Sequence, residues 1–262
     1  MTPSHYLALS LVLLTSASAE VIFSEDFENE SPANNSPYKA SVLRPKHNEA
    51  GKATFIVGET QNLAGSGKGV CLIDQLTESS DSIGLEYDFV DSPEEQISAL
   101  RIDFAFAKWN LKTVKSDKLY FGAGEYFGGD SAKMNSTSRR YLQVELNDDN
   151  TIKFNPATGK DITEDLIPNG RNTLSIFVND HDNKVIEYAH PESGKPTTLK
   201  ANMVAFYLNG KLASEASLDL EDVTASGTVG TSENNFGRFG FYSGTKSDNN
   251  AWIFDDIKVT QL

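Results

Sequence analysis

The sequence predicts an all-β fold in which two antiparallel sheets pack face to face. Apolar and polar residues alternate through most of the chain, and no long stretch repeats apolar residues at the three- and four-residue spacing of a helix. Fifteen Phe and nine Tyr favour strands over helices. Turn-forming residues separate the alternating runs. We therefore expect short strands that each turn one face toward a common core.

Four runs show the alternation clearly. In the segment 99–107, Leu100, Ile102, Phe104 and Phe106 share one face. The same pattern recurs in three later strands, whose expected core residues are Leu142, Val144 and Leu146, then Leu174, Ile176 and Val178, then Val204, Phe206 and Leu208. The residues between them should point away from the core. In the run 141–146 these outward residues are Tyr141, Gln143 and Glu145.

Turn residues predict two hairpins. The sequence Asn147-Asp148-Asp149-Asn150 links the strand 141–146 to a strand at 151–154. Asn209-Gly210 joins the strand that begins at Val204 to a strand that begins at Lys211. Two long polar segments, 30–50 and 182–200, are expected to be loops.

The first nineteen residues are typical of an export signal. The stretch from Leu7 to Leu14 is almost wholly apolar, and Ala17-Ser18-Ala19 supplies small residues for cleavage. We expect residues 1–19 to be a signal peptide and residues 20–262 to form a single sandwich domain that is secreted or periplasmic. The apolar run is too short to span a bilayer, so no membrane insertion is expected. We also expect a monomer.

Charge and cysteine content narrow the classes of partner. The net charge of −14 makes nucleic acid a poor partner, because phosphate binding needs clustered Lys and Arg. An anionic glycan would likewise need a local cluster of Arg or Lys.

Cys71 is the one cysteine, so no intramolecular disulfide can form, and we expect it to be a small core residue. The excess of carboxylates makes a calcium site plausible.

The two ends of the chain after residue 19 look like strand partners. Residues 21–28 and 251–260 are both rich in alternating apolar residues. If the first and last strands pair, both termini are tied to the sheet and the sandwich is closed.

Three segments resemble the concanavalin A-like superfamily, which includes laminin-G-like domains, legume lectins, bacterial endo-β-glucanases and several polysaccharide lyases. They are an opening Phe-x-x-acid-Phe strand at Phe23–Phe27, a hairpin at Tyr207–Lys211, and the closing strands at Gly240–Gly244 and Phe254–Val259. The resemblance implies a two-sheet antiparallel jelly-roll sandwich (concanavalin A-like). It also implies that the protein binds or acts on extracellular polysaccharide.

The resemblance to the bacterial glucanases implies a structural calcium ion with Asp255 as a ligand. Glu25, Asp26 and Glu28 are the nearby carboxylates. Independently, Asp255 is in alternating register with Ile253, Ile257 and Val259, so its side chain should point toward the core at a strand end, where a carboxylate needs a cation or strong hydrogen bonds. The alternative is an Asp bonded to backbone N–H groups at the sheet edge.

Glucanases of this superfamily carry paired carboxylates on one strand, and Glu86, Asp88 and Asp91 have that spacing. A retaining pair would need carboxyl groups about 5–5.5 Å apart. Leu85, Tyr87 and Phe89 look like the core face of the same strand. The alternative interpretation is therefore an ordinary solvated strand face.

Polysaccharide lyases need a cation or amide to neutralise a uronate carboxylate and a Tyr or His to move protons. Arg101 and Tyr141, with His181 at a strand end, are the candidate catalytic residues if the protein is a lyase. If the outward residues share one sheet, they form a polar groove with sugar-binding groups. The candidate ligand-binding residues are Arg101, Gln143, Glu145, Tyr207, Arg238 and Tyr242.

The sequence favours a secreted protein that binds extracellular polysaccharide. A lyase acting by β-elimination on a uronate-containing glycan is the main alternative, and a retaining glycoside hydrolase is a lesser one. A structural or cell-surface protein without glycan affinity is the third. The sequence contains no phosphate loop, no Gly-x-Ser-x-Gly nucleophile motif and no His-x-x-x-His pair.

Overall fold

The computed structural model of the chain describes residues 19–28, 40–43, 53–59, 67–74, 84–108, 119–126, 140–147, 151–155, 166–167, 170–218, 236–243 and 250–262. Within these residues the fold is all-β, as predicted, with sixteen strands and one short 3-10 helix, η1, at Pro93–Glu95. The predicted signal peptide at 1–19 lies outside the described residues except for Ala19.

The strands follow one another in this order: β1 Glu20–Glu25, β2 Ala40–Leu43, β3 Ala53–Glu59, β4 Lys68–Asp74, β5 Gly84–Asp88, β6 Ala99–Lys108, β7 Leu119–Gly124, β8 Arg140–Leu146, β9 Ile152–Asn155, β10 Asn172–Asn179, β11 Ile186–Ala189, β12 Pro196–Leu199, β13 Met203–Leu208, β14 Lys211–Ser217, β15 Arg238–Ser243 and β16 Asn250–Gln261.

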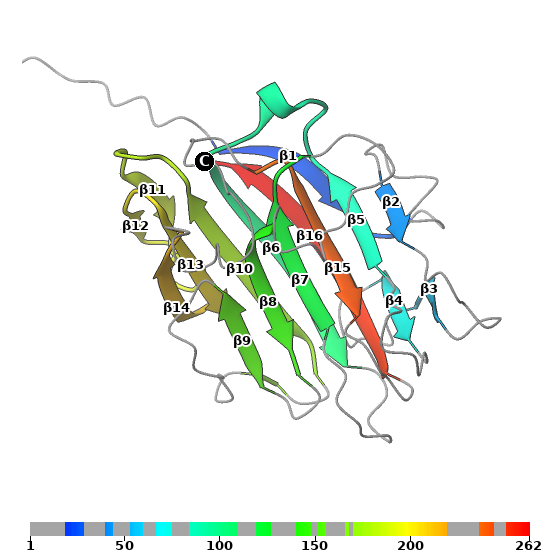
Figure 1. Cartoon of the computed structure of the whole chain (residues 1–262). Helices are drawn as coiled ribbons and strands as arrows, with labels where there is room; N and C mark the ends of the chain where they lie inside the picture. The colour runs from blue at the N-terminus through cyan, green and yellow to red at the C-terminus, as the bar shows by residue number, and fades with distance from the viewer. Residues whose placement is uncertain are drawn as a thin grey trace, which may run out of the picture.

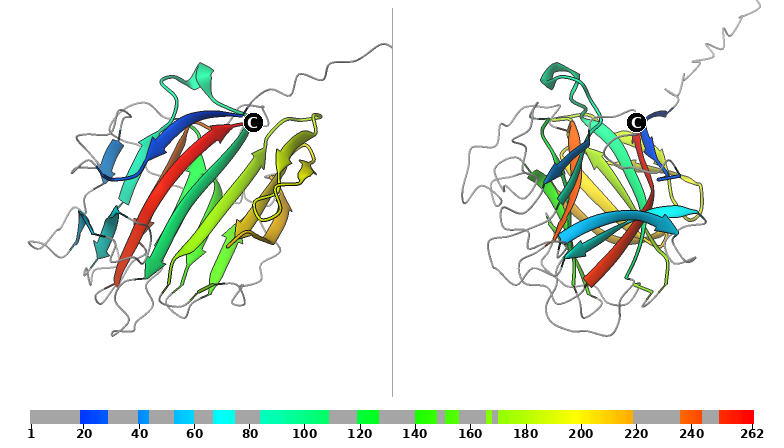
Figure 2. Two further views of the ribbon diagram at one scale, coloured as in Figure 1. Left: turned by 180° about the vertical axis from the view of Figure 1, so that it is seen from behind. Right: turned by 90° about the vertical axis from the view of Figure 1, so that its right-hand side faces the viewer.

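Two large antiparallel sheets form the layers of a sandwich (Figure 1). The first has eight strands in the order β14-β13-β10-β6-β16-β4-β3, with β1 also paired to β16. The second has six strands in the order β2-β5-β15-β7-β8-β9. A two-stranded sheet of β11 and β12 lies on the outer side of the eight-stranded sheet, which faces the viewer in the left view of Figure 2.

The long strand β16 joins both ends of the chain to the middle of the eight-stranded sheet. Along one edge it pairs with β6. Along the other edge its first half pairs with β4 and its second half with β1, where Phe23 lies opposite Val259. The predicted pairing of the first and last strands is therefore confirmed.

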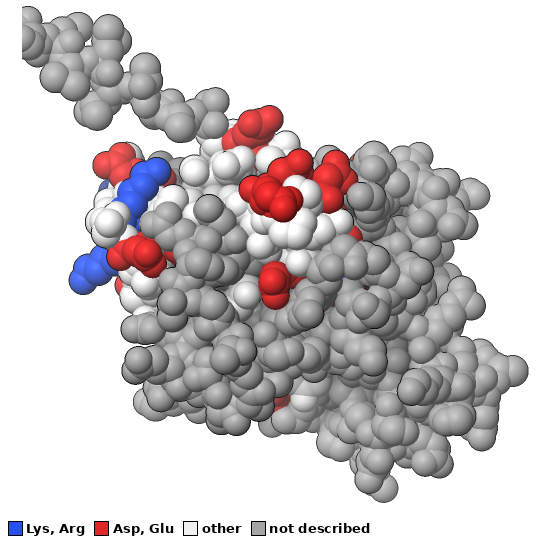
Figure 3. All heavy atoms as spheres, turned by 45° about the horizontal axis from the view of Figure 1, so that its top comes forward, with Lys and Arg blue, Asp and Glu red and all other residues white. Residues whose placement is uncertain are grey.

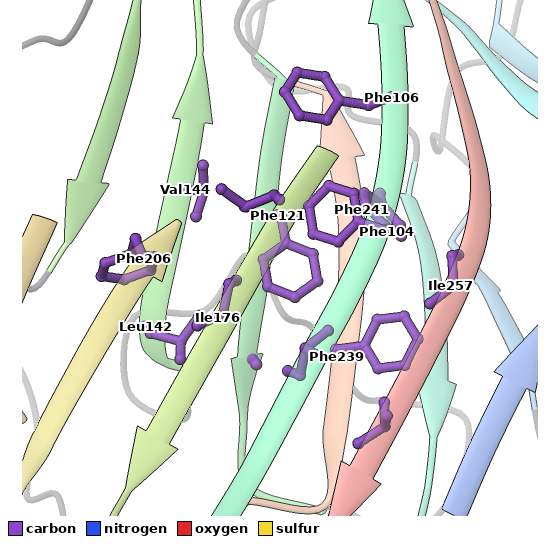
Figure 4. Packing of buried hydrophobic residues seen from close by; sticks show 14 of the residues in the cluster. Phe104, Phe106, Phe121, Leu142, Val144, Ile176, Phe206, Phe239, Phe241 and Ile257 are labelled. Atoms are coloured by element: carbon purple, nitrogen blue, oxygen red, sulfur yellow. The ribbon is translucent and has the colours of Figure 1, made fainter. Parts of the chain in front are cut away.

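Aromatic rings fill the space between the two large sheets (Figure 4). Phe104 on β6 contacts Phe121 on β7 and Phe241 on β15, with ring centroids 4.9 and 5.2 Å apart. Phe241 in turn lies 4.0 Å from Phe254 on β16. All thirteen core residues that alternation predicted are buried in this cluster: Leu100, Ile102, Phe104, Phe106, Leu142, Val144, Leu146, Leu174, Ile176, Val178, Val204, Phe206 and Leu208.

Both predicted hairpins are confirmed. β8 pairs with β9, and Leu146 lies opposite Ile152. β13 pairs with β14 through Asn209 and Gly210, which have φ angles of 51° and 83°. Two successive residues with positive φ give a tight turn whose twist matches that of the strands, which explains the Asn-Gly pair.

The segment 182–200 was predicted to be a loop, and this was wrong, because it contains the hairpin of β11 and β12. Ile186 and Tyr188 on β11 pack with Leu199 against Phe177 and Tyr207 on the outer face of the eight-stranded sheet. Polar residues, two prolines and a glycine surround the short apolar alternation of the segment and hide it. The Asn179 amide nitrogen lies 2.7–3.0 Å from the carbonyls of residues 184, 199 and 200, which share its two N–H groups, and so it fixes both ends of the hairpin.

Two β-bulges break the alternation on which residue orientations were predicted. The first lies opposite Gly124 on β8, and it turns Tyr141 into the core, where its ring meets Phe236 edge-on at 5.7 Å. The second lies between Asp255 and Lys258 on β16. Phe254 and Ile257 both enter the core there, so Asp255 points to the outer face beside Ala105 rather than inward.

Candidate functional site

The outer face of the six-stranded sheet gathers four of the predicted ligand-binding residues. We call this surface the polar face, and its residues are Glu86, Asp88, Tyr120, Gln143, Glu145, Arg238 and Tyr242. Strand pairing arranges them in rows, because Tyr242 lies opposite Tyr120 and Tyr120 opposite Glu145. In the next row Gly240 lies opposite Gly122, and Gly122 lies opposite Gln143.

Two tyrosines form the aromatic part of the polar face. The rings of Tyr120 and Tyr242 are stacked, with centroids 5.0 Å apart and planes 14° apart. Tyr242 is buried, whereas Tyr120, Gln143 and Glu145 are partly exposed. The paired glycines beside them carry no side chain. The two glycines form a low strip beside the tyrosine pair, and on β8 Gln143 continues the glycine row while Glu145 continues the tyrosine row.

A buried ion-pair cluster lies at one end of the polar face. The Arg238 guanidinium donates to both carboxylate oxygens of Asp88 and, through Nη1, to Glu86 Oε2 at 3.3 Å. All three side chains are at most 5% exposed. A Cβ on Gly240 would lie 2.9 Å from Glu86 Cγ, so glycine is needed there for the Glu86 side chain to lie across the strand.

This cluster bears on the predicted carboxylate pair of a glycosidase. Leu85, Tyr87 and Phe89 do point into the core, as predicted, and Glu86 and Asp88 lie on the opposite face of β5. That face is not solvated at these positions, because both carboxylates are buried against one guanidinium. Asp91 is exposed after the strand end. The arrangement stabilises a charge cluster and leaves neither carboxylate facing an open groove.

The outer face of the eight-stranded sheet carries a cleft of about 730 Å³. Its floor comes from β6, β10 and β16, and the hairpin of β11 and β12 forms one wall. Arg101 Nε donates to Asp103 at 2.8 Å, and Ser175 Oγ donates to the same carboxylate at 2.5 Å. The Arg101 guanidinium also lies over the Phe177 ring, 5.1 Å from its centroid. Lys258 lies opposite Asp103 on the neighbouring strand.

The predicted residues therefore divide between two sheets, so the condition for one shared polar groove is not met. Arg101 and Tyr207 lie on the outer face of the eight-stranded sheet, while Gln143, Glu145, Arg238 and Tyr242 lie on that of the six-stranded sheet. Alternation in a strand tells which side a residue takes but not which sheet the strand joins. Tyr207 is also buried beneath the hairpin, where its hydroxyl lies 2.8 Å from the Tyr188 hydroxyl.

The residues predicted for a lyase do not meet. Arg101 lines the cleft, Tyr141 is buried in the core between the sheets, and His181 follows the end of β10. The His181 carbonyl accepts a hydrogen bond from the Asn202 N–H at 3.1 Å. Neither Tyr141 nor His181 lines the cleft. These three positions therefore give no support to β-elimination.

The four carboxylates predicted for calcium each have a separate partner. Glu25 accepts the Phe27 N–H, Asp26 accepts the Glu28 N–H, and Asp255 accepts the Asp256 N–H. Glu28 accepts the backbone N–H of Lys68 at 2.7 Å. Among the described residues, no group of three or more His, Cys, Asp or Glu side chains is arranged to hold a metal ion. These residues do not fit a calcium site as arranged, and the calcium prediction rests on the resemblance alone.

Asp255 predicts a pH dependence of stability. Burial, with a smaller contribution from the neighbouring Asp256 charge, raises the pKa of Asp255 to about 6, although the Asp256 N–H and Arg171 oppose the shift. In the unfolded chain an Asp has a pKa of about 3.9. Asp255 therefore favours the folded state fully below about pH 4, and this contribution is lost as the pH rises through about 6.

The variant Asp255→Asn keeps the oxygen that accepts the Asp256 N–H and removes the charge. We expect its free energy of unfolding to exceed that of the wild type by about 1–3 kcal/mol above pH 6, with the difference vanishing near pH 4. Urea unfolding between pH 4 and 7 in a chelator measures this. If the two proteins differ equally at every pH, Asp255 does not titrate in this range. Bound calcium would reverse the sign, because a cation lowers the pKa of a ligating carboxyl group.

Sequence reasoning missed several residues of both surfaces. Tyr120 was available from alternation, because Phe121 enters the core and its neighbour must face outward. The partners of Arg238 could not be found, since Glu86 and Asp88 are about 150 residues away in the chain. The outward orientation of Lys258 could not be predicted from alternation, because the bulge in β16 interrupts the alternating pattern. Asp103 was seen as outward, but its role beside Arg101 depends on Ser175 from another strand.

Three solved structures of similar shape identify the fold. The globular domain of T. cruzi calreticulin matches over 91% of this chain and 87% of its own, with 14% identity and a TM-score of 0.51. A carbohydrate esterase of the Shiga toxin-encoding bacteriophage phi24B matches over 93% and 99%, with 12% identity and a TM-score of 0.53. The cellulose induced protein Cip1 matches over 90% and 96%, with 11% identity and a TM-score of 0.54.

These likenesses confirm the predicted fold, a two-sheet antiparallel jelly-roll sandwich. At such low identity they establish the fold alone. Neither a protein-family model nor a curated protein sequence matches the chain. In the part of the chain that the structure describes, no helix is long and apolar enough to cross a membrane.

Proposed function

We propose that this protein binds an extracellular polysaccharide through the polar face of the six-stranded sheet. The observation that carries the proposal is the stacked Tyr120–Tyr242 pair beside the glycine strip, with Gln143 and Glu145 next to them on the neighbouring strand β8. An aromatic face packs against the C–H surface of a sugar, and planar polar side chains bond its hydroxyl groups. The polar face offers both kinds of group along a line that follows the strand pairing.

The comparisons support carbohydrate as the class of ligand. Two of the similar structures are described as a carbohydrate esterase and as a cellulose induced protein. The apolar run and small residues of the segment 1–19 favour export, which would bring the protein to polysaccharides outside the cell. Binding is a better proposal than catalysis by a lyase, because Arg101, Tyr141 and His181 lie on separate parts of the fold.

The variant Tyr120→Ala tests the proposal. Screening the wild type on an array of neutral oligosaccharides, including those of cellulose, should first identify a ligand. Isothermal titration should then show about a tenfold loss of affinity in Tyr120→Ala, on the order of 1.4 kcal/mol, because one face of the aromatic pair is removed. Leu212→Ala is the matched control, since Leu212 is 50% exposed on β14 of the other sheet.

Leu212→Ala should bind with the affinity of the wild type. Equal loss in both variants would point to a general change in the fold and would contradict a site on the polar face. Failure of the wild type to bind any saccharide on the array would overturn the proposed function itself.

A further inference from the structure

We propose that the cleft on the outer face of the eight-stranded sheet is a second binding site, which takes an acidic sugar residue, a uronate or a sulfated sugar. This goes beyond the proposed function, because the cleft and the polar face lie on opposite sides of the sandwich. Either surface could bind its ligand without the other. The inference rests on two cationic groups on the cleft floor, the polar groups around them, and the rigid wall beside them.

Arg101 is the first cationic group. Its Nε is engaged by Asp103, but Nη1 and Nη2 make no hydrogen bond to any residue that the structure describes. The side chain is 31% exposed, so these nitrogens can be reached from the cleft. Its position over the Phe177 ring, with Asp103 on one side, holds the guanidinium in one orientation. A planar guanidinium with free terminal nitrogens suits a bidentate oxyanion.

Lys258 is the second cationic group. It is exposed on the cleft floor, and it forms no ion pair with the residues of the described ranges. The bulge in β16 is the reason for its orientation, because it directs Ile257 into the core and Lys258 outward, opposite Asp103. Bulges commonly re-aim a side chain in this way beside functional sites.

The negative charge of Asp103 between the two cations is already compensated. Arg101 forms an ion pair with it at 2.7 Å, and Ser175 Oγ donates to it at 2.5 Å. Arg171, the third cation of the lining, is paired with Asp256 at 3.1 Å, so Lys258 is the lining cation that no described carboxylate pairs with. This contrasts with the chain as a whole, which carries a net charge of −14. On the face shown in Figure 3, acidic side chains spread over the described surface, whereas Lys and Arg gather at one side.

The rest of the lining favours a sugar over other anions. Glu187 and Asp256 bring carboxylates to the cleft, and Thr173 and Thr260 bring hydroxyl groups. Carboxylates accept hydrogen bonds from the hydroxyl groups of a sugar ring, but they repel a second anionic group. A ligand with one anionic group and several hydroxyl groups matches this mixture. A polyphosphate or nucleic acid would meet Glu187 as a like charge, whereas the charge of Asp256 is compensated by Arg171.

The wall of the cleft is held rigidly before any ligand arrives. Asn179 fixes both ends of the β11–β12 hairpin, and the Tyr188 and Tyr207 hydroxyl groups are hydrogen bonded beneath it. Tyr188 packs against the Phe177 ring at 4.0 Å between centroids. A site that is already ordered loses less conformational entropy on binding. The cleft volume of about 730 Å³ is also within the range of small-molecule sites, roughly 300–1,000 Å³.

The test compares two lysines on opposite sheets. The probes are a hexamer of galacturonic acid, its fully methyl-esterified form and a sulfated galactan hexamer. Lys258→Gln removes the cation from the cleft, and Lys153→Gln is the matched control, because Lys153 is an exposed lysine on β9 of the six-stranded sheet. Both variants change the net charge equally. Isothermal titration at two salt concentrations measures the affinities.

We expect at least one acidic hexamer to bind the wild type, with Lys258→Gln weakening it five- to tenfold and Lys153→Gln changing it less than twofold. The methyl ester should bind at least tenfold more weakly than the galacturonic acid hexamer if the carboxylate is the anion recognised, and preference for the sulfated hexamer would assign the site to sulfate. Binding of neither acidic hexamer overturns the inference. The inference is also overturned if the acidic hexamer still binds Lys258→Gln but no longer binds Tyr120→Ala. That result would place the acidic sugar on the polar face, and it would be consistent with the proposed function.

Discussion

Replacing Arg238 with Met is expected to lower the free energy of unfolding by about 3–5 kcal/mol. The guanidinium is 1% exposed and is the shared partner of Glu86 and Asp88. Its removal leaves two carboxylates buried without a cation, and breaking a buried ion pair in this way is among the costliest single substitutions. Urea unfolding measures the loss as a lower midpoint at an unchanged slope.

A second variant keeps this prediction testable even if Arg238→Met does not fold. The triple variant Arg238→Met/Glu86→Gln/Asp88→Asn removes all three charges together. It should recover most of the lost stability, because the cost arises from the uncompensated carboxylates and not from the missing arginine. A loss of stability below about 1 kcal/mol in the single variant, or no recovery in the triple variant, would show that Arg238 does not compensate buried charges on Glu86 and Asp88.

Replacing Phe239 with Ala is expected to cost a similar amount, about 3–5 kcal/mol. Phe239 is fully buried, and its ring lies 5.2 Å from those of Phe23 and Tyr87 and 6.0 Å from that of Phe121. It therefore contacts β1 of the eight-stranded sheet as well as its own neighbours β5 and β7. The cavity left by alanine would open between the two layers of the sandwich.

A smaller substitution at Phe239 and a substitution at the surface serve as controls for this loss of stability. Phe239→Leu keeps most of the volume and should cost less than about half as much. Ile167→Ala changes an apolar side chain that is 49% exposed, and it should alter stability by no more than about 0.5 kcal/mol. Thermal or urea unfolding of the three variants should rank them in that order. Equal effects of Phe239→Ala and Ile167→Ala would contradict the packing.

Much of the fold could be predicted because the alternation of apolar and polar residues within a strand shows which of its faces is buried. The alternation in 99–107 identified the core face of β6, and the Asn209-Gly210 pair identified a hairpin, since both are local signals. The bulges in β8 and β16 were not predictable in this way. Each inserts a residue whose position depends on the partner strand, so Tyr141 and Asp255 point opposite to their expected sides.

The candidate sites were harder to predict because they depend on contacts between distant segments. Alternation correctly showed that Arg101 and Gln143 point away from the core. It could not show that β6 and β8 belong to different sheets, which separates the two residues by the thickness of the sandwich. The buried ion-pair cluster and the cleft wall depend in the same way on pairing across the chain. Both surfaces therefore required the folded structure to be recognised.

The position of β16 has a consequence for how the chain reaches its folded state. This strand supplies hydrogen bonds to β1, β4 and β6, so three earlier strands lack a neighbour until residues 250–261 arrive. Contacts that join the first strand to the last require closure of a loop of more than two hundred residues, which slows folding. During synthesis, the eight-stranded layer therefore cannot close until the final twelve-residue strand has emerged. Until then, exposed strand edges are available to other chains, and a helper protein that shields them would suppress aggregation.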